Sequence, residues 1–372
     1  MVENQTTKKA PESVRIRMYE VGHGDCFLLK FRYQGQADRH VLIDCGTTAA
    51  TWQEQYRRLR EVANDIKEEC GGRLDVVVAT HPHRDHIGGF ARSESPTAPG
   101  AILSALRPRL VLMPWTEDPK RAYFRYQAKV AATLHRALRT STVHATIPNQ
   151  RAVESLQRLG RRRKYLHAGM DSGLDELLPG VRVHVLGPAA ERKADRKFWK
   201  AAIDGPRPKR KLFPTAPQWH PCLAPPQTRW FIDRLSKLQE EQLIALAQSL
   251  NEAVNNTSLI LLFQFGEHSL LFPGDAESAA WHDALQSPFV RKMIARTTVY
   301  KASHHGKANG SPQQLARLLE QPLVLLSSRE TEAGVAGYAK LVGTPAARVS
   351  QRRYIDIELT SDGGSVELER AA

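Results

Sequence analysis

The first fifty residues alternate apolar and polar positions in short runs that predict β-strands. Residues 14–19 alternate in the manner of a half-buried strand. A polar turn at residues 22–25 follows, and residues 26–31 resume the pattern, so the two runs predict a hairpin. Residues 40–43 predict a third short strand, which ends at Asp44.

The next hundred residues change to a helical period and then return to a buried strand. Trp52–Glu69 has apolar residues at helical spacing and stops at Gly71-Gly72. Residues 74–79 (LDVVVA) form an apolar, β-branched run that is typical of a strand buried on both faces. Residues 110–113 predict another short strand.

The middle of the chain is basic and interrupted. Residues 121–159 are mostly helical in pattern, and residues 181–186 predict a strand. Lysines, arginines and prolines gather between residues 191 and 227, and residues 231–250 have an amphipathic helical pattern. We therefore expect residues 191–250 to be a basic, proline-rich insertion of helix and loop within the domain.

The C-terminal part predicts strands again. Residues 258–265 and 269–272 indicate a hairpin around Gly266, and residues 297–302 predict a strand that leads into Ser303-His304-His305-Gly306. Two further strands are expected at 323–327 and 354–359, and there is no internal repeat of fixed period.

The composition is that of a globular protein with an unusual excess of positive charge. The 372 residues are 41% hydrophobic and 25% charged, with a formal net charge of +14. That charge favours polyanionic partners such as nucleic acid, although a basic and otherwise inert surface would look the same. Residues 1–12 are polar and are expected to be disordered, with residues 13–372 forming the domain.

Targeting signals and cysteine motifs are not evident. The polar start does not resemble a secretory signal and no apolar run is long enough to cross a membrane, so we expect a cytoplasmic protein without membrane contacts. The four cysteines have no C-x-x-C spacing, and Cys26 and Cys45 lie in apolar runs as small buried residues.

One segment carries a concentration of potential metal ligands. His81, His83, Asp85 and His86 lie within six positions directly after the buried strand. Zinc in proteins binds imidazole and carboxylate groups, and residues i and i+2 at a strand end can point two rings at one ion. Gly88-Gly89 lets the backbone pass close to the site and start a helix. The segment predicts a metal centre.

These residues carry a family resemblance. THPHRDHIGG, at residues 80–89, resembles the H-x-H-x-D-H signature of the metallo-β-lactamase superfamily. VGHGDCFLL (residues 21–29), LIDCG (42–46), the stretch from Asn255 to Glu277 and YKASHHGKANGS (300–311) resemble, in the same order, segments of its ComEC-type branch. The resemblance implies an α/β fold, the four-layer αββα sandwich, here with the basic insertion.

The resemblance also implies a ligand set. His81 and His83 would bind a first metal ion, Asp85 and His86 a second, and Asp275 would bridge them. One of His304 and His305 would complete the second site, because neighbours on a strand point to opposite faces. The sequence does not say which, and the family pattern gives Asp44 a supporting role behind the turn.

The chain departs from the superfamily pattern at one ligand. A further histidine found in much of the superfamily is replaced here by a region containing Asn255 and Ser258, which we expect to support the site from outside the ligand set. One or two Zn²⁺ ions are expected, with Mn²⁺ or Mg²⁺ as alternatives because oxygen ligands are plentiful. His167 and His184 are the unassigned histidines that could substitute.

A hydrolase of phosphodiesters, with nucleic acid and DNA in particular as substrate, is the function that these features favour. Asp85 and Lys301 are the predicted catalytic residues; Lys301 could meet a phosphate oxygen, or it could be a solvated strand end. The aromatic residues Tyr123, Phe124 and Tyr126 alternate with basic ones and could stack bases. Each basic run taken alone is more typical of a solvated face, but together with a phosphodiester-competent site they favour nucleic-acid contacts. The residues expected to make them are Arg161, Arg162, Arg163, Lys197, Lys200, Lys209, Arg210 and Lys211.

Two other function classes stay open. A phosphodiesterase, esterase or lactonase acting on small molecules would use the same metal centre. A non-catalytic binding or regulatory protein would have kept the fold only. A soluble nuclease of this kind could act in phage defence with protein partners, and the oligomeric state is not readable from the sequence.

Overall fold

A computed structural model of the chain describes residues 10–48, 51–137, 147–191, 240–327, 346–348, 353–363 and 367–370. Its strands form two sheets. The eight-stranded sheet has the order β14-β13-β1-β2-β3-β4-β5-β6. Its strands are β1 (Ser13–Tyr19), β2 (Phe27–Arg32), β3 (Arg39–Ile43), β4 (Val76–Val78), β5 (Leu110–Pro114), β6 (Arg162–Leu166), β13 (Tyr354–Thr360) and β14 (Glu367–Arg370).

The second sheet has six strands in the order β12-β11-β10-β9-β8-β7. They are β7 (Arg182–Gly187), β8 (Ile260–Phe265), β9 (His268–Phe272), β10 (Val299–Lys301), β11 (Leu323–Leu326) and β12 (Ala346–Arg348). The expected hairpin around Gly266 is confirmed, because β8 pairs antiparallel with β9. The expected N-terminal hairpin is also confirmed, with β1 antiparallel to β2.

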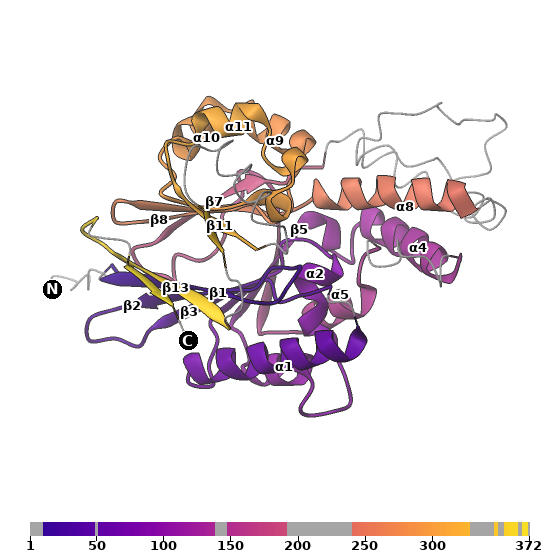
Figure 1. Cartoon of the computed structure of the whole chain (residues 1–372), viewed down its shortest axis with the longest axis horizontal. Coiled ribbons are helices and arrows are strands. Elements are labelled where there is room, and N and C mark those ends of the chain that lie inside the picture. Colours follow the sequence, from indigo (N-terminus) through magenta and orange to yellow (C-terminus); the bar gives the residue numbers. More distant parts are fainter. Residues whose placement is uncertain are drawn as a thin grey trace, which may run out of the picture.

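Helices cover the outer face of each sheet. The helices are α1 (Trp52–Glu69), α2 (Arg84–Ile87), α3 (Pro99–Ala105), α4 (Ala122–Ala137), α5 (Gln150–Leu156), α8 (Glu240–Asn255), α9 (Ser278–Leu285), α10 (Pro288–Ile294) and α11 (Gln313–Leu318). Figure 1 shows the two sheets face to face, with α1 outside the first sheet and α9, α10 and α11 outside the second. The structure is thus a four-layer αββα sandwich, as the sequence predicts.

The pattern of buried residues explains why β4 is apolar throughout. Val76 and Val78 pack into the core between the two sheets, which also contains Phe263 and Phe272. Val77 points the other way, into the core under α1, α3 and α5. A third core lies between the second sheet and its helices and is centred on Trp281. A strand buried on both faces needs no polar alternation.

Some expected boundaries differ from the observed ones. The sequence indicates only a basic run from Arg161 to Tyr165, but Arg162–Leu166 is strand β6, parallel to β5 at the edge of its sheet. Helix α8 extends to Asn255, past the expected end of the insertion at residue 250, and Figure 1 shows it beside α4. The part of the insertion from residue 192 to 239 lies outside the described residues, as do residues 1–9. Among the described helices, none is both long and apolar enough to cross a membrane.

A buried ion-pair network ties α1 to the first sheet. The Arg17 guanidinium, 3% exposed, makes two 2.7 Å hydrogen bonds to the Asp356 carboxylate on β13. It also donates to Asp65 of α1 at 2.9 Å and lies 3.0 Å from Glu69 Oε1. Because β13 comes long after the basic insertion in the chain, this network joins segments that are far apart in the sequence.

Arg17→Met is expected to lower the free energy of unfolding by roughly 3 kcal/mol, because it leaves the buried Asp356 carboxylate without its main cation. Urea denaturation followed by circular dichroism measures the change. The matched control is Arg57→Met, which breaks the exposed pair between Arg57 and Glu61 and should cost less than about 0.5 kcal/mol. Equal effects of the two substitutions would show that the Arg17 network contributes no special stability.

Candidate metal centre

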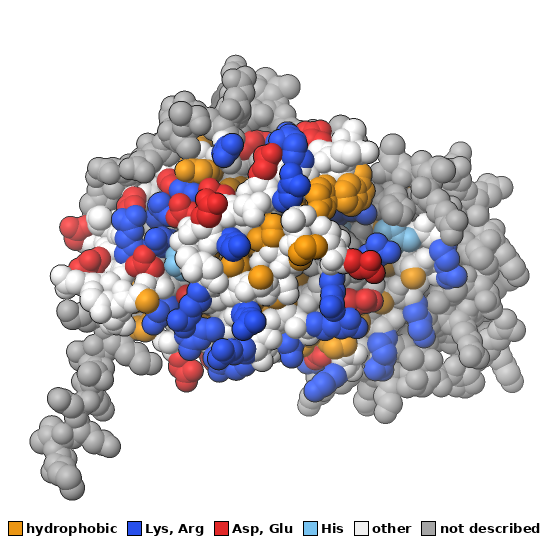
Figure 2. All heavy atoms as spheres, turned by 90° about the horizontal axis from the view of Figure 1, so that it is seen from below, with side chains coloured by type: hydrophobic (Ala, Val, Ile, Leu, Met, Phe, Trp, Pro, Cys, Tyr) orange, Lys and Arg blue, Asp and Glu red, His pale blue; other side chains and the backbone are white. Residues whose placement is uncertain are grey.

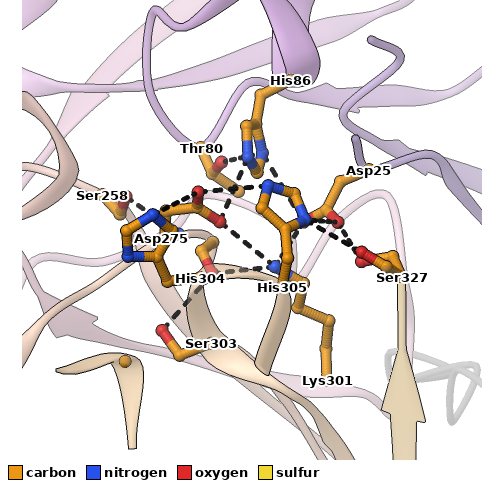
Figure 3. Close-up of polar contacts among 12 residues, drawn as sticks. Asp25, Thr80, His86, Ser258, Asp275, Lys301, Ser303, His304, His305 and Ser327 are labelled. Atoms are coloured by element: carbon orange, nitrogen blue, oxygen red, sulfur yellow. Dashed lines mark hydrogen bonds and ion pairs between the residues drawn. The ribbon is translucent and has the colours of Figure 1, made fainter. Parts of the chain in front are cut away.

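Segments from the two halves of the chain meet at the histidine turn. The turn of residues 81–86 follows β4, and Asp44 follows β3, which lies next to β4 in the same sheet. From the second sheet come Asp275, just after β9, and the short turn Ser303–Gly306, just after β10. Figure 3 shows His86, Asp275, His304, His305 and Lys301 pointing toward one another.

Glycines allow the supporting loops to pack against the histidine turn. A Cβ atom on Gly46 would lie 2.4 Å from the backbone nitrogen of His86, and one on Gly24 would lie 2.6 Å from the carbonyl oxygen of Asp85. A Cβ on Gly89 would meet the carbonyl oxygen of Cys45 at 2.7 Å, which confirms the expected close approach there. Gly88 also starts a helix, as expected, but it is a single 3-10 turn, Gly88–Phe90, directly after α2.

His81 and His83 have the features of neutral metal ligands. Both are buried, and neither Nε2 atom has a hydrogen-bond partner among the described residues. Burial lowers the pKa of His83 to about 4, and burial together with the neighbouring His86 and His83 lowers the pKa of His81. A buried nitrogen that makes no hydrogen bond is costly unless something absent from the protein chain occupies its lone pair.

His86 is held in place on one edge and faces Asp275 on the other. Its Nδ1 lies 2.8 Å from Asp44 Oδ2, and Asp44 also accepts hydrogen bonds from the backbone nitrogen and hydroxyl of Thr80. Its Nε2 lies 3.1 Å from Asp275 Oδ1. Although burial lowers the pKa of His86, the carboxylates of Asp275, Asp25 and Asp44 raise it to about 10. Asp44 therefore occupies the supporting place that the sequence predicts.

The His304-His305 pair differs from the sequence expectation. The pair does not lie on a strand: β10 ends at Lys301, and both histidines have left-handed backbone angles, with φ of 48° and 53°. The alternation argument therefore does not apply, and both rings face Asp275. His305 Nε2 lies 3.3 Å, and His304 Nε2 3.9 Å, from Asp275 Oδ2.

Asp25 supports the site from behind, a role that the sequence reasoning missed. Its carboxylate contacts Lys301 Nζ and Ser327 Oγ, and lies 3.5 Å from His86 Nδ1 and 3.4 Å from His305 Nδ1. Asp25 thus approaches the Nδ1 edge of both rings, while their Nε2 atoms face Asp275. Although its oxygens are near enough to the cluster to be ligands, this arrangement favours orientation of the two rings.

His305 is bound from both edges. Its Nδ1 lies 3.0 Å from the carbonyl oxygen of Ser327, and its Nε2 lies 3.1 Å from Asp85 Oδ2. The ring of His23 packs on it with centroids 4.4 Å apart, and His23 Nε2 lies 3.7 Å from Asp85 Oδ2. His23, Asp85 and His305 therefore form a second group of potential ligand atoms beside the first.

The residues in place of the superfamily's extra histidine support His304 and Asp275. Asn255 donates from Nδ2 to Glu277 Oε1 at 2.7 Å, and that oxygen lies 3.0 Å from His304 Nδ1. Ser258 Oγ accepts a 3.2 Å hydrogen bond from the backbone nitrogen of Asp275. Glu277 and His23, like Asp25, lie within the family-like segments, but their sequence positions alone assign them no role.

Lys301 is buried at the centre of the site. It is 1% exposed, which rules out the solvated strand end. Its ammonium contacts Asp25, donates to the carbonyl oxygen of Gly274 at 2.9 Å and lies 3.4 Å from Asp275 Oδ1. Burial lowers the pKa of Lys301, but Asp25 and Asp275 outweigh burial and raise it above its ordinary value. Lys301 is therefore a fixed positive charge between two carboxylates.

The donor set fits divalent metal ions. Imidazole nitrogens and carboxylate oxygens are what Zn²⁺ and Mn²⁺ bind in proteins. The atoms of Asp25, His86, Asp275 and His305 lie within 4.8 Å of one another. The unpaired Nε2 atoms of His81 and His83 are the second observation in favour, since metal ligation would satisfy both.

Other predicted residues lie away from this cluster. Neither of the unassigned histidines is in the groups of potential ligand atoms found among the described residues. His184, on β7, has its Nε2 2.8 Å from Gln264 Oε1, and His167 Nδ1 lies 2.9 Å from the carbonyl oxygen of Ala168. Tyr123 and Phe124 are buried, which makes them core residues and excludes them as a stacking surface. The side chain of Tyr126 is not described.

The basic residues expected to bind nucleic acid divide into two groups. Arg161, Arg162 and Arg163 are exposed at the edge strand β6, although Arg163 donates to the carbonyl oxygens of Leu159 and Gly160. The others lie outside the described residues, namely Lys197, Lys200, Lys209, Arg210 and Lys211.

Comparison with known proteins finds a family model that matches an N-terminal segment of the chain. No curated protein matches the chain. The segment that the family model does match ends at residue 161, so it includes the histidine turn but not Asp275 or the His304-His305 pair. The narrower ComEC-type resemblance stays a prediction. Residues 19–161 match the family model of the metallo-beta-lactamase superfamily, which together with the Asp/His cluster indicates a metal-dependent hydrolase.

Proposed function

We propose that this protein is a metal-dependent phosphodiesterase that cleaves nucleic acid, with DNA as the favoured substrate. The observation that carries the proposal is the convergence of Asp275 and His305 on the turn from His81 to His86. These groups come from different sheets; the histidines and Asp275 are buried, and the Asp85 side chain is 15% exposed. Burying this many ionisable groups costs free energy, so it requires a ligand or charge partners that compensate for their lost hydration.

The directions of the rings suggest how two cations would be shared. His81 and His83 would hold the first through their free Nε2 atoms, with His304 taking the place of the histidine missing from the superfamily pattern. Asp85, His86 and His305 would hold the second, and Asp275 lies between the two groups. Both His304 and His305 would then be ligands.

The side chains around the ligands fix their orientation. Asp44 and Asp25 contact the Nδ1 edge of His86, and the carbonyl oxygen of Ser327 contacts that of His305, so the Nε2 atoms stay turned inward. Divalent ions at this site would supply a water-derived nucleophile at neutral pH and neutralise charge on the attacked group. Lys301, fixed between Asp25 and Asp275, would hold Asp275 in its charged form.

Charge supports a phosphodiester of nucleic acid over a neutral ester. The net charge of +14 attracts polyanions. Arg161, just before β6, and Arg162 and Arg163 at its start add exposed positive charge to the first sheet.

The test is cleavage of bis(p-nitrophenyl) phosphate and of labelled single-stranded and duplex DNA and RNA, with Zn²⁺, Mn²⁺ or Mg²⁺ added to metal-stripped protein. We expect metal-dependent cleavage that Asp85→Asn and His86→Ala reduce by at least about a thousandfold, since each removes a ligand. His282→Ala, which changes an exposed histidine on α9, is the matched control and should keep full activity. If small esters are hydrolysed and no oligonucleotide is bound or cut, the nucleic-acid substrate is wrong.

A further inference from the structure

A surface pocket lies beside the histidine turn. It has a volume of about 430 Å³ and is bounded by the start of α1, by Arg84 and Gly88 of the turn, and by the loop after it. Arg84 stands between the ligands His83 and Asp85 in the sequence. Arg84 lines the pocket, whereas the predicted metal ligands of the turn do not.

The pocket continues into a second hollow of about 910 Å³ between α3 and α5. Both are bounded by Arg92, Ser93, Glu94 and Arg151, so together they form one groove. Figure 2 views the molecule from the α1 side and shows Lys and Arg side chains spread over this face. The groove runs from the start of α1 past Arg92 and Arg151 to Arg158.

An aromatic pair, the exposed Trp52 and the half-buried Tyr56, marks the end of the groove at α1. Trp52 is 65% exposed, and its ring stacks on Tyr56 with centroids 5.1 Å apart and planes at 18°. The guanidinium of Arg60 lies 5.9 Å from the centre of the Tyr56 ring. A flat, exposed indole is suited to stacking on a nucleobase.

The arginines along the groove are available for anions. Within the described residues, no carboxylate makes an ion pair with Arg84, Arg92, Arg151 or Arg158, whereas Arg57 and Arg58 on α1 are paired with glutamates. The exposed carboxylates in the groove are Glu94 and Glu154, so the arginines outnumber them there. Spaced guanidinium groups next to a stacking surface fit a phosphate backbone with unpaired bases.

We propose that this groove, here called the Trp52 groove, binds a single-stranded segment of nucleic acid that flanks the cleaved phosphate. The proposal rests on the proposed function and narrows it to substrates with an unpaired stretch. Trp52 stacks on one base, and Arg92 and Arg151 contact successive phosphates. A duplex would not fit this role, because its bases are already stacked on one another.

Binding tests the groove separately from cleavage. The probe is a fluorescein-labelled 20-nucleotide oligo-dT, with anisotropy measured on metal-stripped full-length protein. We expect Trp52→Ala to weaken binding about tenfold, since stacking on an aromatic ring contributes on the order of 1–3 kcal/mol per base. Trp52→Phe should recover most of the affinity. Phe289→Ala, at an aromatic residue 61% exposed on α10 of the opposite layer, is the matched control and should bind as the wild type does.

The charge contribution has its own readout. The double variant Arg92→Gln with Arg151→Gln should reduce the slope of log Kd against log salt by about 1 to 2, since each phosphate contact contributes roughly 0.7 for a single strand. Arg296→Gln, on the opposite layer, should leave the slope unchanged. Hydrolysis of bis(p-nitrophenyl) phosphate should be the same in all these variants, because they leave the metal ligands intact.

Two results would contradict the proposal that the Trp52 groove binds single-stranded nucleic acid. One is unchanged oligo-dT affinity in both Trp52→Ala and the double arginine variant. The other is tighter binding of a 20-base-pair duplex than of oligo-dT by the wild type. Failure of the proposed function looks different, because the wild type would then cut neither the small phosphodiester nor DNA with any metal, whatever its affinity for oligo-dT.

Discussion

Replacing Asp275 with asparagine is expected to abolish the rise in thermal stability that divalent metal gives the wild type. Asp275 is 2% exposed, and its oxygens lie within 3.3 Å of both His86 and His305. A ligand at a thousand times its Kd stabilises a protein by about 4 kcal/mol. Without the carboxylate between the two groups, we expect divalent metal to give no measurable stabilisation and hydrolysis to fall by at least about a thousandfold.

The measurement is the melting temperature with EDTA and with Zn²⁺ or Mn²⁺, for wild type and variant. Comparing the rise in melting temperature that metal gives each protein removes any effect of the substitution on the metal-free protein. Asp283→Asn, at an exposed aspartate on α9, is the control and should keep the whole increment. A full metal increment in Asp275→Asn would mean that the carboxylate is no ligand.

Lys301→Met is expected to lower the unfolding free energy of the metal-free protein by about 3–5 kcal/mol. The ammonium lies between Asp25 and Asp275, and all three groups are at least 98% buried. Removing one partner of a buried charge group leaves the other charges uncompensated, which is the costly case. A divalent ion would compensate Asp275, so added metal should narrow the gap between variant and wild type.

Urea unfolding with EDTA and with metal measures both effects. Lys292→Met removes a charge at an exposed site on α10 and should change stability by less than about 0.5 kcal/mol. If Lys301→Met unfolds at the wild-type urea concentration in EDTA, the lysine does not neutralise the two aspartates. If added metal increases the difference in unfolding free energy between Lys301→Met and the wild type, the ion and the lysine do not share Asp275.

Strong local patterns made much of the fold and part of the site predictable. The VVV core of β4 is apolar because both faces are covered, and such a run indicates a buried strand from the sequence alone. The close spacing of His81, His83, Asp85 and His86 predicts metal ligands in the same way, from a short stretch of chain. The place of Asp44 behind the turn came from the family resemblance, and in the structure Asp44 follows β3, which lies next to β4.

Features that depend on tertiary contacts were missed. Strand β6 has the sequence RRKYL, and its exposed arginines give no apolar pattern that would indicate a strand. It forms by pairing with β5. His304 and His305 adopt left-handed backbone angles that non-glycine residues rarely choose locally, so a strand-based argument placed them wrongly. Asp25 acts through His86, His305 and Lys301, which come from distant parts of the chain.

The aromatic residues show the same limit. Tyr123 and Phe124 follow arginine and alanine in a basic helix, which in sequence looks like a stacking surface, yet the helix turns them into the core. Trp52 is at the start of α1 and is exposed. Only the positions of the other helices and loops reveal which of these rings is free for a ligand.

Anomalous diffraction from crystals grown with Zn²⁺ or Mn²⁺ would test the metal centre most directly. We expect one or two strong anomalous peaks enclosed by His81, His83, His86, Asp275 and His305. Data collected at the absorption edge would identify the metal. Well-diffracting crystals without a peak there at millimolar metal, or with His305 and Asp275 turned away from the histidine turn, would contradict the metal centre and the hydrolytic function built on it.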